Sequence, residues 1–303
     1  MYKIIMAPTD GSDAERPALD VAVMLARHFD AELRLVRVET PPVTVDPRSG
    51  PGVLNQTEEM VLEARRAREK KLEALADELR KRGAPHVISS LEIDRVEPGL
   101  RDYANSNGVD LIVMSSHSRG GVQRINLGSV TDYMIRNTDI PTLVVRPTHS
   151  AASGKESGPF DQIVVMLDGS ALSEQILPHV AALAGGSNAD VAVVKVLQPD
   201  FYSKKQEHSG LPFWDDAVAD AETYLDLATR TIDDTVSSVT GEVLMADDVV
   251  TAVLDYCQRT DADLLAMATH GVGGIKRLMF GSIADDMTRR APISVLVFHP
   301  QAK

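Results

Sequence analysis

The sequence has few features of export, crosslinking or membrane insertion. It contains one cysteine, Cys257, among 303 residues, so no intramolecular disulfide can form. No apolar run approaches the roughly 18 to 20 residues that a membrane-spanning helix needs. The segment 1–10 is typical of a strand rather than of a basic, apolar export signal. These absences predict a cytoplasmic protein in a reducing environment.

Positive charge is also scarce. The chain has 31 Lys and Arg against 44 Asp and Glu, a net charge of -13. An electrostatic field of this sign repels the phosphate backbone of nucleic acids and anionic lipid, so we expect neither nucleic acid nor a membrane as partner. The hydrophobic share of 44% and the charged share of 25% are those of an ordinary globular protein, and the length is typical of two domains.

Widespread catalytic and nucleotide-binding motifs are missing. No GxGxxG follows the first strand of either half and no GxxxxGK[ST] occurs, which excludes Rossmann dehydrogenases and P-loop NTPases. Neither His117 nor His270 has a neighbouring Cys, His or carboxylate at metal-ligand spacing. No paired carboxylates or nucleophile elbow stand out. The sequence therefore predicts no catalytic residue and no protein-held metal.

What the chain does contain is one unit in two copies. Asp10-Gly11-Ser12 recurs 158 residues later as Asp168-Gly169-Ser170, and Gly128-Ser129 recurs 153 residues later as Gly281-Ser282. Such self-similarity at a fixed offset indicates a duplicated structural unit.

The copies are separated by residues 148–160, which are small and polar and lack apolar periodicity, as in a flexible linker. We therefore expect a first domain at 1–147 and a second at 161–303. Within each copy, short β-branched runs alternate with segments of helical spacing, which predicts an α/β fold. We expect two tandem doubly wound domains, each with a five-stranded parallel sheet flanked by helices. In the first copy the expected strands are 3–8, 32–38, 86–93, 110–115 and 141–146, and the expected helices 13–28, 57–82, 97–107 and 128–138.

Two stretches of each copy fall at the carboxyl ends of the strands, where doubly wound sheets bind ligands. The first is the turn after the first strand, where Asp10 or Asp168 presents a carboxylate, although an ordinary turn and helix cap would look similar. The second is the loop after the fourth strand, which leads into the Gly-Ser start of a helix. Backbone N–H groups at a helix N-terminus favour phosphate.

These residues resemble the universal stress protein family in its tandem form, and the resemblance covers nearly the whole chain. Nucleotide-binding members of that family carry Gly-x-x-Gly, nine residues, and Gly-[Ser/Thr]. The second copy has a near-intact motif, at Ala268, Gly271, Gly281 and Ser282. The first copy has a degenerate one, at Ser115, Ser118, Gly128 and Ser129.

The resemblance implies ATP as ligand, with Mg²⁺ accompanying the nucleotide. It places Asp10 and Asp168 beside the ribose, lets the backbone of Val38 and Val196 meet adenine, and assigns the phosphates to the Gly-Ser turns. Glycine at 271 allows a closer backbone approach to phosphate than serine at 118 does. We therefore expect the second copy to dominate ATP affinity.

The same resemblance implies that the last strand of each copy, 142–146 and 294–298, pairs with a partner domain. We expect the two copies to pair with each other and the whole chain to form a homodimer. The leading hypothesis is an ATP-binding stress-response sensor or regulator that is not an enzyme. Two alternatives are a slow ATPase or nucleotide-transferring enzyme, and an interaction scaffold that binds no nucleotide.

Overall fold

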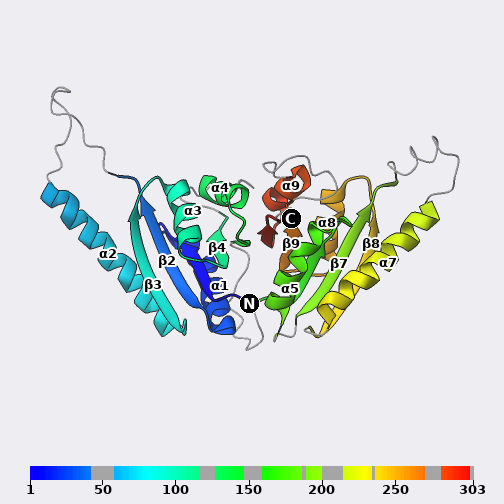
Figure 1. Cartoon of the computed structure of the whole chain (residues 1–303), viewed down its shortest axis with the longest axis horizontal. Coiled ribbons are helices and arrows are strands. Elements are labelled where there is room, and N and C mark those ends of the chain that lie inside the picture. Colours follow the sequence, from blue (N-terminus) through cyan, green and yellow to red (C-terminus); the bar gives the residue numbers. More distant parts are fainter. Residues whose placement is uncertain are drawn as a thin grey trace, which may run out of the picture.

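The fold is seen in a computed structural model of the whole chain (Figure 1). It describes residues 1–41, 58–116, 127–146, 159–185, 189–199, 214–233, 236–269 and 281–300. The predicted site residues Ser118 and Gly271 lie outside the described residues, as does almost all of the predicted linker.

Each half alternates strands and helices, as the sequence predicts. The elements of the first half are β1 (Ile4–Pro8), η1 (Asp13–Glu15), α1 (Arg16–Phe29), β2 (Glu32–Glu39), α2 (Glu58–Lys81), β3 (His86–Ile93), α3 (Val96–Ser106), β4 (Leu111–Ser115), α4 (Ser129–Asn137) and β5 (Thr142–Val145). Those of the second half are β6 (Gln162–Met166), η2 (Ser173–Ile176), α5 (Leu177–Ala184), β7 (Asp190–Leu197), α7 (Trp214–Asp233), β8 (Ser238–Met245), α8 (Val249–Arg259), β9 (Leu264–Ala268), α9 (Ser282–Arg290) and β10 (Ser294–Phe298). The α/β fold with two doubly wound halves is confirmed.

The strands of both halves form one sheet. Its order is β3-β2-β1-β4-β5-β10-β9-β6-β7-β8, and within each half all neighbouring strands are parallel. At the centre, β5 and β10 run antiparallel, with Leu143 opposite Leu296 and Val144 opposite Val295. Each strand thereby covers the other's open edge, which would otherwise expose unpaired backbone N–H and C=O groups.

Helices cover both faces of this sheet. One face carries α1, α2, α5 and α7, which share one large apolar cluster. The opposite face carries α3 and α4 in the first half and α8 and α9 in the second. Because both faces are covered, the central strands are apolar at nearly every position, and β9 is buried throughout. The outer ends of the sheet lie beneath α2 and α7 (Figure 1).

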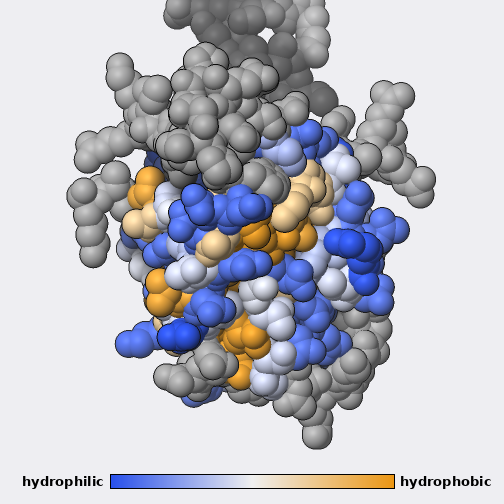
Figure 2. All heavy atoms as spheres, turned by 90° about the vertical axis from the view of Figure 1, so that its right-hand side faces the viewer, coloured by the Kyte–Doolittle hydropathy of each residue, from blue (hydrophilic) through white to orange (hydrophobic). Residues whose placement is uncertain are grey.

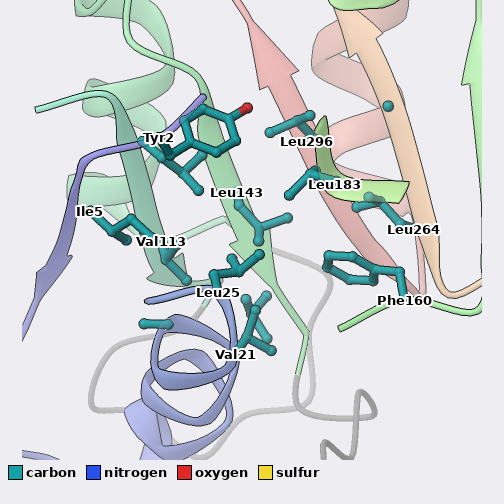
Figure 3. Packing of buried hydrophobic residues seen from close by; sticks show 14 of the residues in the cluster. Tyr2, Ile5, Val21, Leu25, Val113, Leu143, Phe160, Leu183, Leu264 and Leu296 are labelled. Carbon is teal, nitrogen blue, oxygen red and sulfur yellow. The ribbon is translucent and has the colours of Figure 1, made fainter. Parts of the chain in front are cut away.

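The halves pack through a shared apolar core. Leu143, Leu296 and Phe160 are almost fully buried, and Figure 3 shows them beside one another between the two halves. Burying one such side chain contributes about 1.5 to 3 kcal/mol. Tyr2 adds a polar contact, because its hydroxyl lies 2.9 Å from Nδ1 of His179 in α5. The joint is therefore mainly apolar, with polar contacts from Tyr2 and from the buried Arg146, whose guanidinium donates to the Thr288 carbonyl.

A ring of four charges also links the halves, between α4 and α9. Arg136 pairs with Asp132 on its own helix and with Asp285 of α9. Arg289 pairs with Asp285 and, at 2.6 Å, with Asp132. The two helices that begin with the Gly-Ser turns are therefore held to each other.

The outer surface of the second half is mostly hydrophilic, with separate apolar patches (Figure 2). The first turn of helix α7 contains two acidic residues, Asp215 and Asp216. Among the described helices, none combines the length and the apolar composition that crossing a bilayer requires.

Candidate functional site

The turns after β1 and β6 are built alike. Oδ1 of Asp10 accepts a hydrogen bond from the Ser12 N–H at 2.8 Å, and Oδ1 of Asp168 accepts one from the Ser170 N–H at 2.9 Å. The residue between them is glycine in both turns, with φ of 81° at Gly11 and 92° at Gly169. Residues other than glycine rarely adopt such φ angles. Both predicted aspartates thus lie at the carboxyl edge of the sheet, where each also holds its own turn together.

The hydroxyl groups of the two turns differ in their bonding. The Ser170 hydroxyl donates to Oδ1 of Asp168 at 2.7 Å. The Ser12 hydroxyl oxygen is buried and has no hydrogen-bond partner among the described residues. The first turn therefore retains one unused polar atom that the second turn uses.

A carboxyl group that the sequence analysis missed lies beneath the first turn. Glu15, 9% exposed, accepts hydrogen bonds from the Thr9 hydroxyl at 2.5 Å and from the Asp10 N–H at 2.6 Å. Burial raises the pKa of Glu15 to about 7. The corresponding residue of the second half is Ser173, whose hydroxyl oxygen accepts from the Asp168 N–H at 3.4 Å. The same backbone group thus meets a carboxyl in one half and a hydroxyl in the other.

The predicted Gly-Ser turns begin α4 and α9. The Gly128 N–H donates to the Ser116 carbonyl at 2.9 Å, and the Gly281 N–H donates to the Thr269 carbonyl at 3.1 Å. Neither glycine supplies a side-chain acceptor to the first-turn N–H groups of its helix. Ser129 and Ser282 follow as exposed first residues of the helices. This arrangement suits an anion, because the helix dipole and the N–H groups point toward the same place.

Close packing also requires glycine at position 281. A Cβ there would lie 2.7 Å from the Thr269 carbonyl oxygen, closer than real Cβ contacts. The close approach of helix α9 to the end of β9 therefore requires glycine whether or not a ligand binds.

A pocket of about 460 Å³ lies at the carboxyl edge of the first half. It brings together four of the predicted residues: Asp10, Val38, Ser115 and Gly128. Five apolar side chains form one part of its wall: Val38, Val96, Leu100, Met114 and Val130. The volume falls within the range of about 300 to 1,000 Å³ that is usual for small-molecule sites. An apolar wall beside a helix N-terminus can accept a flat ring and an attached anion.

The other predicted residues that the structure describes do not line this pocket. Val196 is half-buried at the end of β7, and Ala268 is buried at the end of β9.

In the first half, two hydrogen bonds fix Ser115. Its hydroxyl donates to the Ala14 carbonyl at 3.2 Å, and its carbonyl accepts from the Thr131 hydroxyl at 2.9 Å. The end of β4 is thus tied both to the first turn and to α4.

Charged side chains distinguish the two halves most clearly. In the first half Glu39 pairs with Arg37 at 2.8 Å and with Arg68 of α2 at 2.9 Å, and all three line the pocket. In the second half the matching residues are Lys195 and Leu197, so the carboxylate is missing. Nζ of Lys195 instead donates to the Asp168 carbonyl at 2.7 Å. Lys195 therefore bonds the backbone of its turn, whereas Arg37 lies beside the equivalent turn and pairs with Glu39.

The environment of Lys195 lowers the pKa of its ammonium group. Nζ lies 5.1 Å from the ring centre of Tyr224 in α7. Burial lowers the pKa of Lys195, and the charge of Asp168 acts in the opposite direction. No group of three or more His, Cys, Asp or Glu side chains that could hold a metal ion occurs in the described part of the chain.

Comparison with known proteins agrees with this architecture. The model of the universal stress protein family matches residues 1–146 and again residues 159–299. The chain belongs to the universal stress protein family. Its two matches cover both halves of the sheet, so the tandem form is confirmed.

Two relatives and one solved structure show the extent of the similarity to this universal stress protein. The universal stress protein MJ0531 of Methanocaldococcus jannaschii is 31% identical over 48% of this chain and 83% of its own length. A universal stress protein of Mycolicibacterium smegmatis is 24% identical over 98% of this chain and 97% of its own length. The crystal structure of a universal stress protein from Archaeoglobus fulgidus superposes with a TM-score of 0.70 at 16% identity, over 98% of both chains. That likeness supports the fold of the tandem protein.

Proposed function

We propose that this universal stress protein binds an adenine nucleotide at the carboxyl edge of its sheet and acts in the stress response through occupancy rather than catalysis. The observation that carries the proposal is the pocket of the first half. It joins the apolar wall around Val38 and Val130 to the Gly128 start of α4. Few other ligand classes combine a flat apolar ring with a polyanion.

The pocket offers a complement to each part of such a ligand. The apolar wall removes the base from water, which favours binding in proportion to the buried area. Asp10 supplies carboxylate oxygens for sugar hydroxyls, and the N-terminus of α4 supplies N–H groups for phosphate. Mg²⁺ would enter bound to the phosphates, since no cluster of ligand side chains occurs among the described residues.

The second half is expected to bind as well. Its loop contains Gly271, and the expectation that it dominates ATP affinity stands on that residue. The described geometry adds one condition, because Lys195 lies against the Asp168 turn and has to move or to meet the ligand. A lysine that meets phosphate would increase the affinity of this half.

A slow ATPase is the second candidate, and Glu15 is the observation that favours it. A buried carboxyl whose pKa is about 7 has the proton affinity of a general base. Both of its oxygens, however, already accept hydrogen bonds from Thr9 and from the Asp10 and Gly11 amides. We therefore favour binding, with turnover far below the roughly 1 to 1,000 per second of typical enzymes.

Titration calorimetry of the full chain with Mg²⁺ and ATP tests the proposal. Val130→Trp places a larger side chain in the apolar wall of the first pocket. Ile283→Trp makes the same kind of change at the equivalent position of α9, which is exposed. We expect loss of one binding event in Val130→Trp, with native circular dichroism in both variants. Absence of ATP binding to the unaltered chain would favour the scaffold alternative. A turnover within the enzyme range would favour the ATPase.

A further inference from the structure

Glu15 occupies a position in the first half that the second half fills with an uncharged group. Its carboxyl accepts three hydrogen bonds, from the Thr9 hydroxyl and from the N–H groups of Asp10 and Gly11. The three-residue turn η1 directs it back beneath the strand end. In the second half Ser173 meets the Asp168 N–H with a neutral hydroxyl. Only the first site therefore contains a titratable group at this position.

The same carboxyl forms part of the wall of the nucleotide pocket. Glu15 lines it together with Asp10, Ser115 and Gly128. A cavity of about 460 Å³ is about 8 Å across, which is comparable with the screening length of about 8 Å in physiological salt. Charges on Glu15 and on a phosphate bound in this cavity therefore lie within about one screening length of each other, and the burial of Glu15 reduces the screening further.

Charged groups approach Glu15 from several elements, and each cation near it is already paired. Asp10 lies on the same turn. Arg37 of β2 lies beside the turn but pairs with Glu39, and Arg68 of α2 pairs with the same carboxylate. On the outer side, next to a second small cavity that Glu15 also lines, the ion pairs are Arg16 with Asp13 and Glu78, and Arg82 with Asp20.

The balance of these effects raises the pKa of Glu15 toward neutral pH. Burial is the largest cause and raises the pKa of Glu15 to about 7, and the charge of Asp10 acts in the same direction. The hydrogen bonds from Thr9 and from the Asp10 amide oppose the rise. Both protonation states of the Glu15 carboxyl are therefore accessible near neutral pH.

We propose that Glu15 couples the binding of an anionic ligand in the first half to the uptake of one proton from solvent onto its carboxylate. The inference rests on the proposed nucleotide site and concerns its regulation. Three carboxylates line the pocket, and one of them, Glu39, is paired with Arg37 and Arg68. A phosphate that enters the pocket is repelled by the other two, Asp10 and Glu15, and protonation of Glu15 removes its share of this repulsion. The second half has Ser173 at this position and binds without this proton.

Proton coupling has a defined direction. Above neutral pH the free protein has an ionised Glu15, so binding requires a proton that is increasingly scarce. The affinity for ATP in the first half falls by up to about tenfold between pH 6 and pH 8. Adenosine, which has no charge, enters the same pocket without this dependence.

Calorimetry on the full chain tests the coupling, with Gly271→Val removing the contribution of the second loop. Mg²⁺-ATP is titrated at pH 6, 7 and 8, in buffers of different ionisation enthalpy, so that the protons taken up per nucleotide are counted. We expect a substantial fraction of one proton near pH 7 and none with adenosine. Glu15→Gln should abolish the uptake and flatten the pH profile, whereas Asp13→Asn, an exposed carboxylate of the same turn, should retain both.

The outcomes separate this inference from the proposed function. Binding of ATP without proton uptake, or equal uptake in Glu15→Gln, overturns the coupling and leaves the nucleotide site intact. Absence of ATP binding at every pH overturns both. Circular dichroism of Glu15→Gln verifies its fold, and the NMR titration of the Glu15 carboxyl carbon in the free protein must give a midpoint near 7.

Discussion

The contact between Tyr2 and His179 makes the stability of the protein depend on pH in a predictable way. Burial lowers the pKa of His179 from 6.5 to about 4, because the ring lies among Tyr2, Phe298 and the apolar joint of the two halves. The unfolded chain therefore binds a proton at a higher pH than the folded chain does. The contribution of the neutral His179 to the free energy of unfolding is fully present above pH 6.5 and is lost as the pH falls toward 4. A shift of this size corresponds to about 3 kcal/mol at most.

Urea unfolding followed by far-ultraviolet circular dichroism between pH 7.5 and pH 4 measures this effect. The double variant Tyr2→Phe with His179→Phe removes the titrating ring and its buried hydroxyl partner together, so no unpaired polar group remains. We expect the difference in free energy of unfolding between the protein and this variant to change by about 2 to 3 kcal/mol across that range. His86→Gln, which replaces an exposed histidine of β3, provides the baseline. Parallel pH profiles of the protein and the double variant would refute the reasoning.

Three further changes test the joint and the second site. Leu296→Ala, at the buried centre of β10, should lower the free energy of unfolding by about 2 to 5 kcal/mol in urea titrations, and a smaller loss than this range would show that the joint repacks. A double-mutant cycle on Arg136 and Asp285, each about one third exposed, should return no more than about 1 kcal/mol and fall further in about 1 M salt. Gly281→Ala sets a Cβ against the Thr269 carbonyl, so the thermal midpoint should fall by an amount equivalent to about 1 to 3 kcal/mol, and an unchanged midpoint would contradict the close approach.

The regular elements were predictable from the sequence because the buried faces impose their period on it. The strand expected at 110–115 is observed as β4, Leu111–Ser115, and the helix expected at 128–138 is α4, Ser129–Asn137. The start of the first helix was less well predicted. Residues 13–15 form a separate three-residue turn before α1, because Glu15 bends back to bond the strand end.

Part of the site was also predictable, and the missed part has a physical cause. Asp10 and Gly128 were found because each belongs to a motif that occurs twice. Glu15 and Arg37 were missed because a charged residue beside a turn usually faces solvent. The signal that could have found Glu15 is the difference between the copies, since the matching position, Ser173, is uncharged. A duplicated chain shows its specialised residues where the two copies disagree.

The two copies differ in charge around the turn that follows their first strand. Glu15 and Glu39 of the first half have no carboxylate counterpart in the second, where the space beside the turn is taken by Lys195. The strands beneath these residues keep the same order and register in both halves. If both halves bind an anion as proposed, the first takes up a proton on Glu15, and in the second Lys195 either moves or meets the ligand. Because the ion ring joins α4 to α9, the helices that begin at these two sites meet across the joint, and with the proposed nucleotide binding and proton coupling a chain with both halves would respond to nucleotide and to pH together.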